Sequence, residues 1–203
     1  MNQLMNTINS RQSIRKYDQN VKINRSEVLE ILQEAAQAPS SHNLQPWRFI
    51  IVDEANEKKE LRQIAWGQEQ IETSSATIAI IGDTEAYRLA DKIAQKSVEE
   101  GLMHEEGQKN YVQGVNQLYP NAPYEALKGI AQFDGGLIAM QFMLIAKSKG
   151  YDTVCMGGFD KAAFAEKYNL DSRYIPLVLI SLGKAAAPTY KTTRLNVEDL
   201  LLG

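Results

Sequence analysis

The sequence predicts a mixed fold, either α+β or α/β, in which helix predominates over strand. Apolar runs of strand length lie at residues 48–53, 77–83 and 175–183. Apolar residues recur at helical spacing over 27–37 and 125–149. The chain has 203 residues, 44% of them hydrophobic. That composition suffices for one sizeable core, so we expect residues 1–203 to form a single domain.

The chain begins with a predicted short helix at residues 2–10 and continues into a basic segment. Arg11, Ser13 and Arg15 alternate there, so an extended backbone would direct all three side chains to the same side. Two guanidinium groups and a hydroxyl suit a phosphate monoester. A solvated basic face with ordinary salt bridges explains the same spacing equally well.

The next predicted helix, residues 27–37, leads into a polar loop at 38–47. Asn24 caps this helix, and Glu27 completes a capping box. Pro39 ends the helix, and Pro46 sets the entry into the first strand. The polar side chains of the loop are Ser40, Ser41, Asn43 and Gln45. They suit the edge of a planar polar ligand, although a loop of this kind taken alone is more often a turn that satisfies its own backbone.

The middle of the chain carries weaker signals. We expect a charged surface helix at 56–65 and a long helix at 85–106. In the loop between them, at 66–70, Gln68 and Gln70 could reach a ligand, although loop glutamines are usually solvated. Residues 108–123 show no firm period, so we expect an irregular lid or substrate-facing loop.

The helix predicted at 125–149 is the strongest in the chain, and its second half is apolar nearly all round. It should therefore be central and buried. Gly135 and Gly136 lower its helix propensity, which predicts the close approach of another backbone, within the subunit or across a dimer axis. Gly150 ends this helix.

A short strand within 151–160 then runs into the turn at Gly157 and Gly158, where a flat ligand could lie against exposed backbone N–H groups. The lone cysteine, Cys155, is predicted to be a buried, inert thiol. A helix at 161–168 follows, and a final short helix is expected at about 197–201.

Charge and composition exclude several classes of protein. The net charge is −3, but residues 1–25 carry five basic and one acidic residue, hence 5 − 1 = +4, which leaves −7 for the rest. This favours a local anion site or a basic arm and argues against a nucleic-acid binder. The single cysteine indicates the cytoplasm. We read the apolar runs as strand-sized, so no membrane span is expected.

The residues that support catalysis by side chains are scarce. Two histidines without metal-ligand spacing argue against a zinc or iron site, and there is no GxGxxG, Walker or G-x-S-x-G motif. What remains is an anion site beside a polar loop and a Gly-Gly turn. This combination suits a phosphorylated cofactor that performs the reaction itself.

Three blocks together resemble the flavin-dependent nitroreductase family. They are Arg11-Gln12-Ser13-Ile14-Arg15, the run from Ala38 to Trp47, and Met156-Gly157-Gly158-Phe159, followed by a late Arg194. The resemblance covers nearly the whole chain. It implies a three-layer α-β-α fold of the α+β class, with a central mixed, mainly antiparallel sheet and a long buried helix at a dimer interface. It also implies an FMN enzyme that is a homodimer with both flavins in the interface.

The resemblance assigns the cofactor-binding residues. Arg11, Ser13, Arg15 and Arg194 would hold the ribityl phosphate, and Gln70 would contact the ring or ribityl chain. Met156 and Gly157 would pack on one ring face, with the Gly157 N–H aimed at N5. The loop side chains would approach from the partner subunit. The implied set is Arg11, Gln12, Ser13, Arg15, Pro39, Ser40, Ser41, Asn43, Gln45, Gln70, Cys155, Met156, Gly157, Gly158 and Arg194.

The implied activity is electron transfer from NADH or NADPH to small electron-poor acceptors such as nitroaromatics or quinones, by a ping-pong mechanism through flavin N5. No side chain need act as a general acid. Cys155 stands where many relatives have proline, and Gly67 and Gln70 where many have asparagine and lysine. Without that lysine, the reduced anion should be stabilised less. The alternative is a flavin-binding or sensor protein of the same fold with little turnover.

Overall fold

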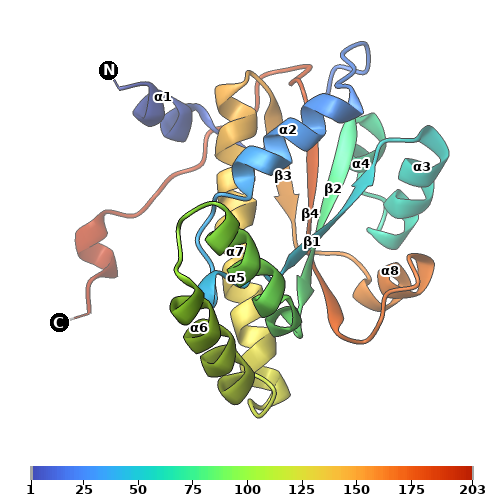
Figure 1. The fold of residues 1–203 in the computed structure, drawn as a ribbon. Helices are drawn as coiled ribbons and strands as arrows, with labels where there is room; N and C mark the ends of the chain where they lie inside the picture. Colours follow the sequence, from blue (N-terminus) through green and yellow to red (C-terminus); the bar gives the residue numbers. More distant parts are fainter. Residues whose placement is uncertain (1, 203) are drawn as a thin grey trace.

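Four antiparallel strands form the central sheet of the computed structural model, which describes residues 2–202 (Figure 1). The strands are β1 (Trp47–Val52), β2 (Ala76–Asp83), β3 (Asp152–Met156) and β4 (Tyr174–Gly183), in the order β1-β2-β4-β3. This confirms the α+β class. Among the described residues, parallel pairing is limited to one isolated bridge, between Ser13 and Thr153.

Helices cover both faces of the sheet and produce three layers (Figure 1). One face packs against α2 (Arg25–Ala35) and α7 (Tyr124–Ser148). The other packs against α3 (Ala55–Ile64), α4 (Glu69–Thr73) and α8 (Lys161–Lys167). The central strand β2 is buried throughout, because its successive side chains enter the two cores in alternation.

The predicted N-cap of α2 is confirmed, but only half of the capping box forms. The side-chain oxygen of Asn24 accepts a hydrogen bond from the Glu27 backbone N–H at 2.9 Å. The Glu27 carboxylate instead accepts a hydrogen bond from the Tyr151 hydroxyl at 2.6 Å. The side chain that would have closed the box therefore ties α2 to the start of β3.

Helix α7 contacts the sheet through Gly135, where a side chain and not a backbone comes close. A Cβ at Gly135 would collide with Leu177 Cδ1, whereas Gly136 faces open space. Leu177 is the extra residue of a bulge in β4, because Ile80 pairs with Val178 and Ile81 with Pro176. The expectation of a close backbone approach at both glycines is therefore wrong within the subunit.

By length and composition, α7 could cross a membrane, which corrects the expectation that all apolar runs are strand-sized. Its buried residues instead pack on the sheet and the helices beside it. They include Ile138 and Phe142, which are fully buried. This is the environment of a core helix in a globular domain.

Two predictions for the middle of the chain are wrong. Residues 85–106 do not form one helix: η2 (Ala86–Leu89) and α5 (Ala90–Glu99) are followed by a break in which Gly101 has a φ of +71°. Residues 108–123 are mostly helical within α6 (Glu105–Leu118). Tyr111 and Val115 face α5 from α6 and stabilise this helical hairpin.

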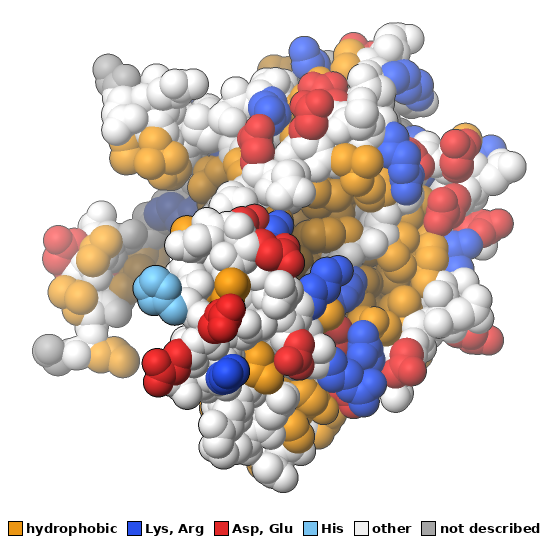
Figure 2. Space-filling view, viewed as in Figure 1, with side chains coloured by type: hydrophobic (Ala, Val, Ile, Leu, Met, Phe, Trp, Pro, Cys, Tyr) orange, Lys and Arg blue, Asp and Glu red, His pale blue; other side chains and the backbone are white. Residues whose placement is uncertain are grey.

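The two termini extend from the same side of the molecule (Figure 1). Helix α1 (Gln3–Ser10) and the tail with η3 (Val197–Leu200) form as predicted, although η3 is a 3₁₀ helix. Their large apolar side chains are exposed, and Figure 2 shows them on that side. They are Leu4, Met5, Ile8, Leu195, Val197, Leu200, Leu201 and Leu202.

Candidate functional site

A cationic cavity of about 90 Å³ joins the beginning of the chain to its end. Its lining residues are Arg11, Gln12, Ser13, Arg15, Tyr190, Thr192 and Arg194. The structure thus brings together the four residues that the resemblance assigned to the phosphate, Arg11, Ser13, Arg15 and Arg194, with Gln12 beside them. Tyr190 and Thr192 were not predicted.

The backbone of the basic segment is fixed by the free edge of β3. The Ile14 N–H donates to the Thr153 carbonyl at 3.1 Å, and Ile14 itself is buried. Tyr17 forms a second bridge, to Ala185 after β4. This extended stretch lets the alternating arginines and serine share one cavity, as the spacing predicted.

The arginines of this cavity have neutral partners. Arg15 Nη1 donates to the Tyr190 hydroxyl at 3.1 Å, and Arg194 Nη1 donates to Thr192 Oγ1 at 2.8 Å. Within residues 2–202, no carboxylate forms an ion pair with Arg11, Arg15 or Arg194. The basic segment therefore does not form the salt-bridged face that was the alternative prediction. Its guanidinium groups can accept an anion in the cavity.

Helix α4 supports the turn at the end of β3. Gln70 is buried, and its Nε2 donates to Gln68 Oε1 at 2.8 Å and lies 3.1 Å from Met156 Sδ. Gln68 Nε2 donates to the Gly158 carbonyl at 2.8 Å. The prediction of solvated loop glutamines is wrong, because these two carboxamides position the turn.

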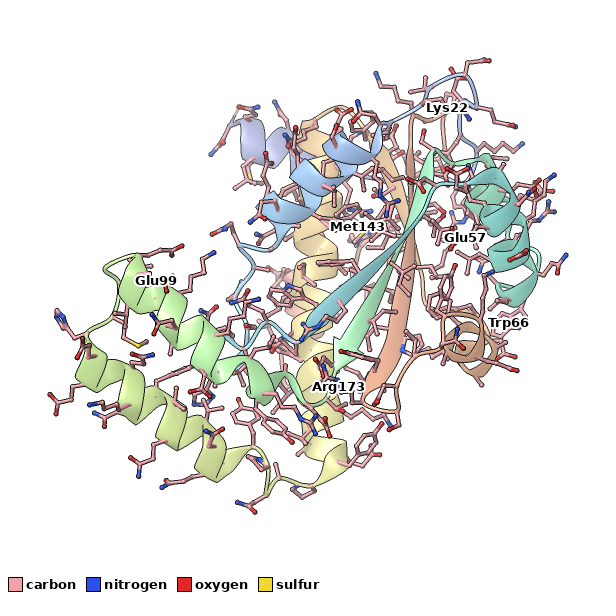
Figure 3. All side chains as sticks on the ribbon, turned by 45° about the vertical axis from the view of Figure 1, so that its right-hand side comes forward. Lys22, Glu57, Trp66, Glu99, Met143 and Arg173 are labelled. Carbon is pink, nitrogen blue, oxygen red and sulfur yellow. The ribbon has the colours of Figure 1, made fainter. Side chains whose placement is uncertain are left out.

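Trp66 lies beside the same turn. It is 71% exposed, and its backbone φ of +55° is in the left-handed region, which is uncommon for a bulky residue. A Cβ added to Gly158 would meet Trp66 Cζ3 at 3.2 Å. Figure 3 shows Trp66 between the end of α3 and α8. A large exposed aromatic surface therefore borders the turn.

Cys155 is exposed, which corrects the prediction of a buried thiol. It lines an apolar cavity of about 340 Å³ together with Met140 and Met143 of α7. Neighbouring protein desolvates the thiol and raises its pKa, while the Arg11 guanidinium acts in the opposite direction. The shift favours the thiol over the thiolate, and the low reactivity of Cys155 stays a prediction.

The polar loop at 38–47 is held in a strained conformation. His42, Asn43 and Gln45 have φ values of 49°, 54° and 50°. Ser40 Oγ accepts a hydrogen bond from the Gln45 backbone N–H at 3.0 Å, so the loop satisfies part of its own backbone, as the alternative interpretation predicted. The Ser41 N–H instead donates to Asp134 of α7 at 2.9 Å.

The polar loop lines a different cavity from the one that the arginines line. Asn43 and Gln45 line a separate cavity of about 460 Å³, with Lys92 and Lys96 of α5, and none of its lining residues belongs to the cationic cavity. Sequence reasoning gave no role to the lysines.

Similarity to known proteins extends over nearly the whole chain. A sequence profile of the Nitroreductase family matches residues 8–184. The Bacillus subtilis (strain 168) protein YdgI, provisionally named an NAD(P)H nitroreductase, is 40% identical over 201 residues, 98% of this chain and 96% of YdgI. The protein named CLA biosynthesis enone reductase, from Lactiplantibacillus plantarum, is 34% identical over 97% of this chain and 92% of its own length.

A crystal structure from Exiguobacterium sibiricum, provisionally described as a nitroreductase in complex with FMN, is similar throughout. It superposes with a TM-score of 0.95 and 41% identity, covering 100% of this chain and 98% of that chain. The likeness thus includes the N-terminal segment, the loop, the Gly-Gly turn and the tail.

Proposed function

Because the chain belongs to the Nitroreductase family, we propose that it is an FMN-dependent oxidoreductase that takes electrons from NADH or NADPH. The observation that carries the proposal is the cavity in which Arg11, Arg15 and Arg194 converge without a carboxylate partner among the described residues. A phosphate monoester is the anion that such a set suits best.

The residues present fit FMN at two points. The cationic cavity suits the terminal phosphate. The turn suits the flat ring, because nothing in the described chain lies within 4 Å of the position that a Cβ at Gly157 would take. Between Thr153, beside the cavity, and Gly157, four residues of strand span about 13 Å. That separation suits a cofactor with a phosphate at one end and a ring at the other.

When bound, FMN supplies the hydride and electron transfer through its own N5, so the protein need only bind and orient it. In this proposal Arg11, Ser13, Arg15 and Arg194 hold the phosphate. The Gly157 N–H faces the ring, and Gln70 orients Met156 beneath it. No side chain of the site is required as a general acid.

We propose that the protein acts as a homodimer in which each site combines two chains. The polar loop and the cationic cavity share no lining residue, which supports a contribution of the loop from the partner. Further support comes from the exposed apolar side chains of α1 and the tail, and from Phe133 and Met140 on α7. Ser40, Ser41, Asn43 and Gln45 are then contributed in trans.

The acceptors we propose are small electron-poor molecules such as nitroaromatics or quinones, reached after the nicotinamide leaves in a ping-pong sequence. The single cysteine favours the cytoplasm. A flavin-binding or sensor protein remains the second candidate. It is favoured by the neutral Gln70, which provides no cation near the ring.

Purification and an anaerobic titration test the proposal. We expect a yellow protein, or an apoprotein that becomes yellow with added FMN, whose flavin absorbance bleaches with NADH or NADPH. Subsequent addition of a nitroaromatic or quinone should restore the absorbance. A preparation that takes up no FMN contradicts the proposal. Flavin that binds but is not reduced by either nicotinamide supports the sensor instead.

A further inference from the structure

Asp134 is a fully buried carboxylate on α7 that the proposed chemistry does not use. Its Oδ2 accepts the Ser41 backbone N–H at 2.9 Å, and its Oδ1 lies 3.4 Å from Ser41 Oγ. Both contacts are to the polar loop. An ionised carboxylate is costly to bury, and removing it from water raises the pKa of Asp134, whereas the Ser41 hydrogen bonds lower it. A carboxylate is therefore costly to keep at this buried position, and a structural or functional role would explain its presence.

Helix α6 holds the neighbouring residue of the loop from the other side. The Tyr111 hydroxyl donates to the His42 carbonyl at 2.7 Å. Tyr119 Oη lies 2.8 Å from His42 Nδ1, and the two rings meet edge to face. His42 is one of the residues with a left-handed backbone. The tyrosines therefore fix the loop at its strained part.

The other end of the loop is also anchored. Arg48 Nη1 donates to the Gln45 carbonyl at 3.1 Å, and Arg48 forms an ion pair with the buried Asp83 at 2.6 Å. Leu44 is buried between η2, α5 and α6. Each of these contacts constrains the backbone or the core side of the loop, while the Asn43 side chain stays exposed.

We propose that Asp134 is a positioning residue that, with Tyr111 and Tyr119, holds the strained loop ready to contact the flavin of the partner subunit. The inference rests on the proposed function, because that function supplies the flavin. A left-handed conformation at several non-glycine residues costs free energy and persists only where surrounding contacts enforce it. The Asp134–Ser41 hydrogen bonds hold the residue that precedes the left-handed segment, and the tyrosine contacts hold His42 within it.

Two substitutions separate positioning from charge. Asp134→Ala removes both acceptors from Ser41. Asp134→Asn keeps an oxygen for the Ser41 N–H and offers an N–H₂ to Ser41 Oγ. We expect FMN affinity to fall about tenfold or more in the alanine variant, the scale of a lost charged hydrogen bond, and to be largely retained in the asparagine variant.

Hydrogen exchange on the apoprotein gives a second measurement that needs no flavin. Amides 40–45 should exchange faster in Asp134→Ala than in wild type, and at nearly the wild-type rate in Asp134→Asn. Asp171→Ala is the matched control, because Asp171 Oδ1 accepts a backbone N–H at 3.0 Å in an exposed turn. In Asp171→Ala, neither the exchange rate of amides 40–45 nor the FMN affinity should change. If Asp134→Ala does not fold, Tyr111→Phe gives a milder test with the same expected direction.

Unchanged loop exchange and FMN affinity in Asp134→Ala overturn the inference. An asparagine variant as impaired as the alanine variant also overturns it, since charge and not positioning would then matter. Wild-type protein that binds no FMN counts against the proposed function alone, because the exchange measurement still decides whether Asp134 holds the loop.

Discussion

Ser13 pairs with Thr153 in a parallel bridge at the free edge of β3. This relationship joins a segment near the N-terminus to the strand that ends in the Gly-Gly turn. It therefore fixes the cationic cavity relative to the turn.

Removal of a cavity arginine should weaken FMN binding. We expect Arg11→Ala to cost roughly 1–3 kcal/mol of FMN affinity, because a phosphate loses a charged hydrogen-bond partner. Titration of apoprotein with FMN, followed by flavin fluorescence, measures this. Lys16→Ala is the control: Lys16 is an exposed cation of the same segment that does not line the cavity. Equal losses in the two variants would indicate a general charge effect and not a phosphate site.

Charge at position 70 should change the flavin potential. Gln70→Lys places a cation beside Met156, and a unit charge within about 10 Å contributes about 1–2 kcal/mol at an effective dielectric constant of 20. We expect the midpoint potential to rise by about 30 mV for the two-electron couple, and to fall in Gln70→Glu. Equilibration with reference dyes measures both. A potential that is the same in both variants would place Gln70 away from the ring.

Trp66 should report the arrival of the flavin. It borders Gly158 and is exposed, whereas Trp47 is buried in the core between the sheet and α2. FMN bound at the turn should therefore quench mainly the red-shifted emission of an exposed indole. In Trp66→Phe that component should be missing, and the remaining emission should change less on FMN addition. Equal fractional quenching in wild type and variant argues against this location.

Mixed dimers test the contribution in trans. Arg11→Glu should disable the phosphate site of its own chain, and Ser40→Trp should block the loop that serves the partner. A heterodimer of the two variants then has one site with both defects and one with neither. We expect each variant homodimer to bind no FMN tightly and the isolated heterodimer to bind one. No recovery in the heterodimer would mean that loop and cavity serve the same chain's flavin.

Asp134 should make stability depend on pH. Its pKa is raised in the folded protein, so the folded state binds more protons than the unfolded state between the unfolded value and the raised value. Stability contributed by the neutral form is therefore present at low pH and lost as pH rises through the folded pKa. Relative to wild type, Asp134→Asn should gain unfolding free energy as pH rises above about 4. Urea unfolding at several pH values measures this, and a constant difference contradicts it.

The sequence predicted those elements that are determined by residues close together along the chain. The apolar period gave α7 and the strands, and Asn24 gave the start of α2. The alternation of Arg11, Ser13 and Arg15 predicted a shared cavity, because an extended backbone alone determines it. The helix cap and the alternation depend on contacts within a few residues. The burial of α7 and of the strands is evident from their apolar composition.

The errors lie where distant contacts decide the structure. Helix α6 has a polar composition, but Tyr111, Val115 and Tyr119 recur at intervals of four and could have revealed it. Gln68 and Gln70 are ordinary loop residues until Gly158 and Met156 pack beside them. Asp134 had one local signal, a lone acid within an apolar helical stretch.

The contact between Gly135 and Leu177 restricts how this protein can diverge. A methyl group at position 135 would overlap Leu177 Cδ1, where α7 crosses the bulged strand. A larger residue at position 135 therefore requires that the Leu177 side chain move or be replaced by a shorter one. Across natural variants, these two positions should therefore covary, and the angle at which the long helix crosses the sheet should be inherited with them.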